Sequence, residues 1–138
     1  MFHNHYVIMF FISIISGLLT TMNVWVDRYD DIRFSINDLY MSTMMSGWMI
    51  LLMGLYYKDL YPIIIGVIIV IISFWCIRTQ FMVDRTQYIL GMIPHHSMAV
   101  HMSKKLIKNK PSISPIKKLV ENIIITQEKE IEYMKQFV

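Results

Sequence analysis

Between Met92 and Met102 the chain concentrates side chains that could bind a metal. This stretch of eleven residues, Met-Ile-Pro-His-His-Ser-Met-Ala-Val-His-Met, holds three of the chain's five histidines and three of its thirteen methionines. Imidazole nitrogen is a borderline ligand and thioether sulfur is a soft one. A mixed His/Met set therefore suits copper better than other common biological metals. Because coding bias can also enrich methionine, the argument rests on spacing rather than on methionine count.

Two amphipathic helices are predicted to carry these side chains. Asp84 is a suitable N-cap for a helix that runs to about Asn109, and a short loop follows. Ser114 followed by Pro115 is typical of the start of a second helix, which continues to the C-terminus. Residues 79–138 are therefore predicted to form a helical hairpin. A hairpin of this size is too small for a self-sufficient core, so it should lean on a membrane, extend the third span or dimerise into a four-helix bundle.

Helical spacing brings candidate ligands from both helices together. A helix turns by about 100° per residue, which puts most candidates of the first helix on one face. That face comprises Tyr88, Met92, His95, His96, Ala99, Met102, Ser103 and Leu106. The second helix has an apolar face interrupted by two polar residues, comprising Ile116, Val120, Ile123, Gln127, Glu130, Ile131, Met134 and Phe137. Folding the hairpin about its loop aligns residues near 95 with residues near 128, so the two polar residues should meet Met92 and the histidine pair.

The carboxylate of Glu130 allows two interpretations. A carboxylate on an apolar face is costly unless it is paired or binds a cation. It could complete a metal site with His95 and His96, or it could accept hydrogen bonds from these imidazoles in a structural network. Spacing alone leaves both open. Pro94 adds weight to the metal site, because it cannot donate to the carbonyl of Leu90 and can kink the helix where the ligands converge.

Residues 1–78 are predicted to form a membrane anchor. Uncharged apolar runs cover residues 6–26, 39–57 and 60–77, and each is long enough to cross a hydrocarbon core of about 30 Å. A cleaved signal peptide is the rival interpretation of the first run, but no Lys or Arg precedes that run and it lacks a small-x-small cleavage site. The predicted fold is an all-α membrane protein with three transmembrane helices followed by the amphipathic hairpin.

Two further patterns could bind copper. The second span has methionines at every fourth position with one more beside them, namely Met41, Met45, Met49, Met53 and Met44. These could hand Cu(I) along a helix, or they could be lipid-facing and packing side chains. At the N-terminus, Met1-Phe2-His3 puts a histidine third after a free amine, an arrangement that can wrap Cu(II) in square-planar nitrogens. The plainer interpretation is a flexible terminus with incidental histidines.

Charge is unevenly distributed along the chain. From Arg78 to Val138 there are ten Lys or Arg against five Asp or Glu, whereas the loop from Asp27 to Asp38 has four Asp against two Arg. A basic segment beside a membrane is usually a solvated face, and attraction to anionic lipid is the alternative. No Gly-rich arm or aromatic-interleaved patch indicates a nucleic-acid partner. The single cysteine, Cys76, excludes an internal disulfide.

The hairpin sequence resembles a known domain family. It contains Asp84-x-x-x-Tyr88, then Gly91-Met92-Ile93-Pro94-His95-His96-Ser97-x-Ala99-Val100-x-Met102, and later Ile123-Ile124 and Gln127-x-x-Glu130-Ile131-x-x-Met134. From about Asp84 to Val138 this pattern resembles the ferritin-like family catalogued as domain of unknown function 305, and the three spans look like those of its membrane-anchored members. The resemblance implies a ferritin-like helical bundle and, in some members, copper binding linked to copper tolerance in an extracytoplasmic compartment.

The resemblance also ranks the candidate ligands. Together with the spacing, it selects Met92, His95, His96, Met102, Glu130 and Met134 as metal ligands, and Met98, His101 and Gln127 as less certain ones. Larger members of the family repeat the hairpin, whereas this chain has it once. A homodimer that completes a four-helix bundle is therefore expected.

We expect a membrane-anchored protein that binds copper, preferentially Cu(I), for sequestration or tolerance rather than for catalysis. No nucleophile–base pair supports hydrolysis, and a di-iron oxidase would need several inward carboxylates where only Glu130 clearly faces inward. The alternative is a membrane scaffold whose hairpin docks a partner helix or oligomerises. The positive-inside rule favours a cytoplasmic hairpin, but the resemblance favours an extracytoplasmic one, which we adopt as the expectation.

Overall fold

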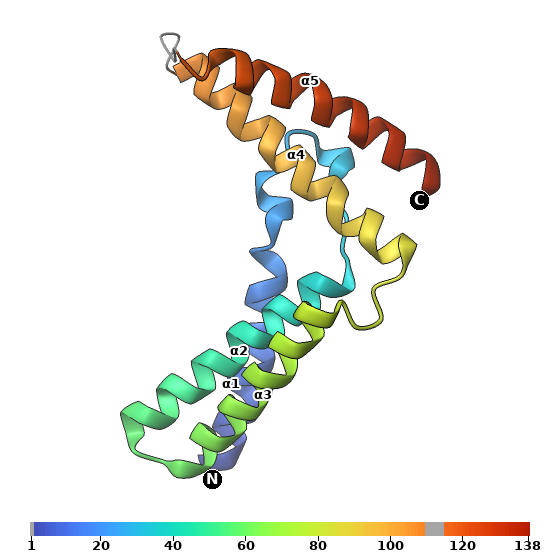
Figure 1. Ribbon diagram of the computed structural model, residues 1–138. Helices are drawn as coiled ribbons and strands as arrows, with labels where there is room; N and C mark the ends of the chain where they lie inside the picture. Colours follow the sequence, from blue (N-terminus) through green and yellow to red (C-terminus); the bar gives the residue numbers. More distant parts are fainter. Residues whose placement is uncertain (1, 110–114) are drawn as a thin grey trace. The chain divides into compact units, whose positions relative to one another are not determined.

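The computed structural model describes residues 2–109 and 115–138, and this part of the chain is entirely helical (Figure 1). The predicted all-helical class is confirmed, because the described residues contain five α-helices and no strand. The α-helices are α1 (Phe2–Leu19), α2 (Ile36–Tyr57), α3 (Leu60–Thr79), α4 (Arg85–Asn109) and α5 (Lys117–Met134). Three short 3-10 helices accompany them, namely η1 (Met22–Trp25), η2 (Tyr29–Asp31) and η3 (Lys135–Phe137).

The chain divides into two compact units. The three-helix unit consists of Met1–Thr21 and Ile36–Val83, and the hairpin unit consists of Met22–Ser35 and Asp84–Val138. The sequence analysis assigned everything up to residue 78 to the anchor. The structure instead groups Met22–Ser35 with the hairpin, because η1 and η2 pack against α4.

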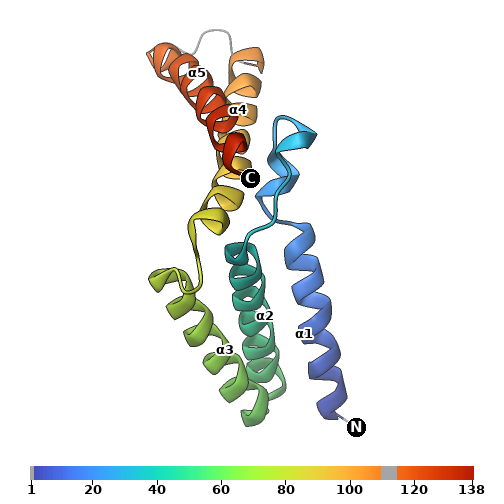
Figure 2. The same ribbon diagram turned by 90° about the vertical axis from the view of Figure 1, so that its right-hand side faces the viewer.

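In the three-helix unit, α2 lies between α1 and α3 (Figure 2). Three segments are long and apolar enough to cross a membrane by length and composition, namely His5–Trp25, Ile36–Tyr57 and Leu60–Thr79. Their ends agree with the predicted spans to within three residues. Large apolar side chains cover the outside of the unit, including Val7, Phe11, Ile15, Leu52, Ile64, Ile68, Ile71 and Phe74. Such a surface is unusual for a protein in water and suits a lipid environment.

Small residues let α2 and α3 approach closely. A methyl group added at Gly66 would lie 2.6 Å from the backbone nitrogen of Leu51 and 2.8 Å from the carbonyl oxygen of Gly47. Helices in lipid gain little from burying apolar surface against each other, so close backbone packing through such glycines is a main source of their association. The methionine pattern of α2 does not share this interface, since Met41, Met45 and Met49 are exposed.

Helix α4 of the hairpin unit begins at the predicted cap. The Oδ1 atom of Asp84 accepts a hydrogen bond from the backbone nitrogen of Gln87 at 2.8 Å, and α4 then continues through Pro94 to its predicted end. Helices α4 and α5 run side by side as an antiparallel pair (Figure 1). The α-helix α5 begins at Lys117, and the predicted cap Ser114 lies outside the described residues together with the loop 110–113.

The buried face of α4 differs from the predicted one. The core of the unit consists of Ile89, Ile93, Val100 and Ile131, with Ile124 and Met134 packed against it. Of the predicted face, Tyr88, His95 and Met102 are exposed, whereas Ser97, which was not assigned to it, is fully buried. The predicted face was centred on the wrong residues, because the prediction allowed for a single partner helix, α5. In the structure α4 also packs against η1 and η2, which lie within Met22–Ser35.

Replacing Gly66 by alanine should destabilise the three-helix unit. The added methyl group meets backbone atoms, which cannot move as a side chain can, so we expect a loss of about 1–3 kcal/mol in the free energy of unfolding. Unfolding of the full chain in detergent micelles measures this. The neighbouring exposed Val67→Ala variant is the control and should stay close to wild type; equal stability of the two variants would contradict the close packing.

Candidate metal site

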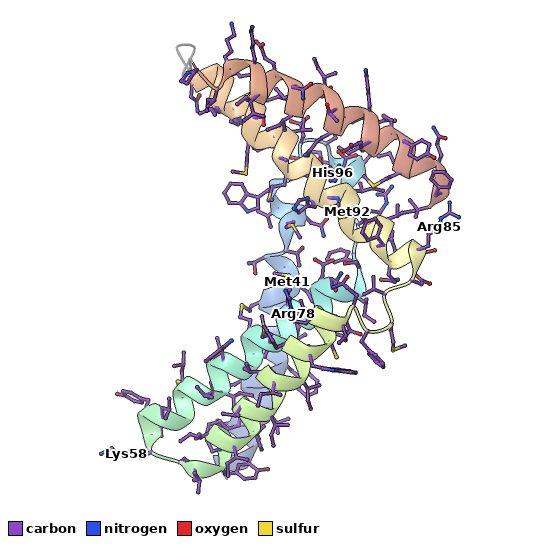
Figure 3. The ribbon with its side chains drawn as sticks, in the orientation of Figure 1. Met41, Lys58, Arg78, Arg85, Met92 and His96 are labelled. Atoms are coloured by element: carbon purple, nitrogen blue, oxygen red, sulfur yellow. The ribbon has the colours of Figure 1, made fainter. Side chains whose placement is uncertain are left out.

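His96 and Glu130 connect α4 to α5. The Nδ1 atom of His96 lies 3.1 Å from the Oε2 atom of Glu130, at the register that the spacing predicted. Figure 3 shows His96 on α4, with Met92 one turn before it. The contact has the distance of a hydrogen bond but not its direction, since the buried Nδ1 atom makes no hydrogen bond of good geometry. The two side chains are therefore in contact without a well-directed hydrogen bond.

The surroundings of His96 favour its neutral form. Its side chain is 14% exposed, and this burial lowers its pKa below the usual value. The carboxylate of Glu130 acts in the opposite direction, and the neighbouring His95 lowers the pKa further. A neutral imidazole is the form that binds metal ions.

Gln127, on the face of α5 that carries Glu130, has another buried polar atom that makes no hydrogen bond. Its Oε1 atom is buried and has no hydrogen-bond partner among the described residues. Because Gln127 precedes Glu130 by three residues, the two side chains share one face of the helix. Buried polar atoms in native proteins are almost always satisfied, so this orphaned acceptor is consistent with a bound cation or water.

The other predicted ligands vary in their exposure. His95 is exposed, with its ring centre 5.9 Å from that of His96. Met92 and Met98 are half-buried, and the half-buried Met134 packs against the isoleucine core. No group of three His, Cys, Asp or Glu side chains in the described residues could hold a metal ion. A site of three or more protein ligands in the described part of the hairpin would therefore draw on other donors, such as methionine sulfur or the amide oxygen of Gln127.

His101 and Met102 lie in a different environment. Together with Trp25 they line an open cavity of about 510 Å³. The Nδ1 atom of His101 is 3.8 Å from the Oδ1 atom of Asp27, and the side chain of Met102 is 53% exposed. These two candidates are thus turned toward the segment 22–35 and solvent rather than toward α5.

Asp31 is a buried acid that the sequence analysis missed. It is only 1% exposed, although Glu130, at 49%, was expected to be the inward carboxylate. The hydroxyl of Ser97 donates to the Oδ2 atom of Asp31 at 2.6 Å, and the ammonium of Lys135 forms an ion pair with Oδ1. The only signal in the sequence was the surplus of aspartates in this loop, which specifies no partner.

Further ion pairs connect the acidic segment to the basic hairpin. Lys104 contacts Asp27 at 2.7 Å and Glu128 at 2.8 Å, and hydrogen bonds to both raise its pKa. Arg28 contacts Glu132 at 3.1 Å. Exposed pairs of this kind contribute little individually. Lys104 with Asp27, and Lys135 with Asp30 and Asp31, pair basic residues of the hairpin with acidic residues of the loop.

The comparisons with known proteins identify the family. Residues 80–138 match the family model described as "Domain of unknown function (DUF305)". Over 127 residues the chain is 44% identical to "Uncharacterized protein L153" of Acanthamoeba polyphaga mimivirus, which covers 88% of this chain and 83% of the viral protein. The chain belongs to the family of this viral protein, and its C-terminal part is a DUF305 domain. No solved structure matches the chain.

The DUF305 match confirms the resemblance to that family for the hairpin. It contains all nine candidate ligands, whereas Asp31 and the rest of Met22–Ser35 lie outside it. The domain in this chain is therefore completed by a segment that comes from between two apolar helices. The proposed Cu(II) motif Met1-Phe2-His3 is untested, because Met1 and the side chains of Phe2 and His3 lie outside the described residues.

Removing the buried carboxylate should strongly destabilise the hairpin unit. In Asp31→Ala the hydroxyl of Ser97 loses its acceptor and the ammonium of Lys135 keeps only the exposed Asp30 and Glu132, so we expect a loss of about 3 kcal/mol in the free energy of unfolding. Urea unfolding followed by circular dichroism measures this. Asp30→Ala, which removes an exposed carboxylate beside the same lysine, should cost less than about 1 kcal/mol. Similar losses in both variants would contradict the role of Asp31.

The stability of the hairpin unit should fall in mild acid through His96. An unfolded histidine titrates near about 6.5, and burial lowers the pKa in the folded state. The unfolded state therefore binds the proton first, so this stability is complete above about pH 6.5 and is lost as the pH falls through the lower folded pKa. Unfolding midpoints across this range should depend less on pH in His96→Asn. Parallel pH profiles for the two proteins would refute the assignment.

Proposed function

We propose that this protein is a membrane-anchored copper-binding protein that holds Cu(I) in the His/Met-rich DUF305 hairpin. Its role would be metal sequestration or tolerance. The observation that carries the proposal is the meeting of His96 and Glu130 across the two helices, at 3.1 Å. The imidazole is held neutral by burial and lacks a well-directed hydrogen bond, which leaves it available to a metal.

The donor types around this pair fit Cu(I). Met92 precedes His96 by four residues and Met134 follows Glu130 by four, so each thioether shares a helix face with one member of the pair. In this arrangement His95, His96 and the two methionines would hold the ion, and Glu130 would balance its charge. Thioether sulfur and imidazole select Cu(I) over the harder divalent ions that prefer oxygen.

Anchoring would come from the three-helix unit. Its helices have the length and composition of membrane spans, and the apolar side chains on their outer surface favour lipid over water. We propose that all three cross the bilayer and that the hairpin lies on the extracytoplasmic side, where copper tolerance proteins of this family are expected to act. The exposed arginines near the helix ends argue weakly for the opposite orientation.

A homodimer would complete the hairpin. Several large apolar side chains of the hairpin are exposed, namely Tyr88, Met102, Ile116, Leu119, Ile125, Tyr133 and Phe137. Two helices cannot bury a full core, and a second hairpin would cover part of this surface to give a four-helix bundle. In such a dimer the exposed Met102 would be available to a shared site.

The same apolar surface favours a second candidate function. A membrane scaffold would use it to dock a partner helix, with His96, Gln127 and Glu130 fixing the register. This hypothesis needs no metal. The scaffold hypothesis predicts that a copper chelator changes neither folding nor self-association. The copper hypothesis predicts that the chelator lowers the melting temperature, because a bound ion stabilises the folded state by mass action.

Copper titration of the full chain tests the proposed site. The His95→Ala/His96→Ala variant should bind Cu(I) at least about tenfold more weakly than wild type at the hairpin, because both imidazole donors are gone. Competition with a chromophoric Cu(I) chelator under reducing conditions measures the affinity. The Lys108→Ala variant, on the exposed end of α4, is a control that should bind normally. Equal binding by the double histidine variant and wild type would refute the hairpin site.

A further inference from the structure

One end of the three-helix unit contains a cavity lined by metal-binding side chains. The start of α1, the end of α2 and the turn before α3 surround a space of about 570 Å³. Its lining residues are His5, Tyr6, Met9, Met53, Tyr57 and Asp59. They supply one imidazole, two thioethers and a carboxylate, and none of them lies in the DUF305 match. None of these lining residues belongs to the proposed hairpin site.

The helices position these donors on facing surfaces. His5 and Met9 are four residues apart on α1, so both project from the same face of that helix. Met53 projects from α2, which packs directly against α1. Met9 and Met53 are half-buried, and His5 is exposed at the open end of the cavity. The imidazole and the two sulfurs therefore face one space from two neighbouring helices.

Charge at the cavity favours a cation. Asp59 is half-buried, and its Oδ1 atom caps α3 by accepting from the backbone nitrogen of Tyr61 at 3.1 Å. The hydroxyl of Tyr6 donates to its Oδ2 atom at 3.4 Å, which ties α1 to this turn. The adjacent cation, Lys58, is exposed and points away from the helices in Figure 3. The carboxylate is thus left as the charged group of the cavity, and a negative wall raises the local concentration of cations.

We propose that this cavity is a Cu(I) site formed by His5, Met9 and Met53, separate from the hairpin site. A set of one nitrogen and two thioether sulfurs is soft and suits a cuprous ion of low coordination number. Met53 differs from Met41 and Met49 of the same helix, which are exposed, because it lines this cavity together with a histidine. The proposal does not depend on copper binding by the hairpin.

Methionine-to-leucine substitutions test the site with little change in volume. The full chain in detergent micelles is titrated with Cu(I) against a chromophoric chelator. The Met9→Leu/Met53→Leu variant should bind one equivalent of Cu(I) per chain fewer than wild type, or should bind that Cu(I) at least about tenfold more weakly. The matched control, Met41→Leu/Met49→Leu, carries the same exchange at two exposed positions of α2 and should keep the full stoichiometry. Loss of the same equivalent in both variants, or in neither, would overturn the proposal.

The His95→Ala/His96→Ala background separates the two sites. In this background the Cu(I) bound in the cavity should remain. X-ray absorption should show sulfur neighbours around this copper. Adding Met9→Leu/Met53→Leu should then remove it, while helix content by circular dichroism stays unchanged. Copper retained with only nitrogen and oxygen neighbours would overturn the cavity site. Unchanged total binding in the histidine variant would instead contradict the hairpin site alone.

Discussion

The buried carboxylate of Asp31 fixes how the hairpin unit is assembled. Removing a charge from water is expensive, and the cost is recovered only when a cation and hydrogen-bond donors are held at the right positions. Here Ser97 supplies the donor from α4, and Lys135 supplies the cation from the end of the C-terminal helix. One carboxylate therefore joins the segment 22–35 to both helices of the hairpin.

This interaction determines the rotation of α4 and, with it, the candidate site. Because Ser97 must face Asp31, its neighbour His96 lies at the edge of the core, and His95 is turned outward. The pair His96–Glu130 consequently sits at the margin between the two helices, with Glu130 half exposed. An ion held at such a margin would be able to exchange with solvent, whereas chemistry that excludes water needs a dry, enclosed site.

The sequence predicted local features well and long-range ones only in part. The apolar runs and the cap at Asp84 set most helix limits, and simple counting from the loop aligned residues near 95 with residues near 128, within one helical turn of the observed contact between His96 and Glu130. The rotation of α4 was not predictable in this way. It depends on a contact between residues separated by 66 positions, and nothing in the pattern around Asp31 identifies Ser97 as its partner.

The methionines show why residue type and spacing cannot define a site on their own. Met41 and Met49 belong to a repeat as regular as a ligand stripe, yet both are exposed, and an exposed thioether is an ordinary apolar side chain. Met53 continues the same repeat but reaches a cavity that also contains an imidazole and a carboxylate. The difference arises from the neighbouring elements, because helix α1 places an imidazole beside Met53 and the turn before α3 places a carboxylate there.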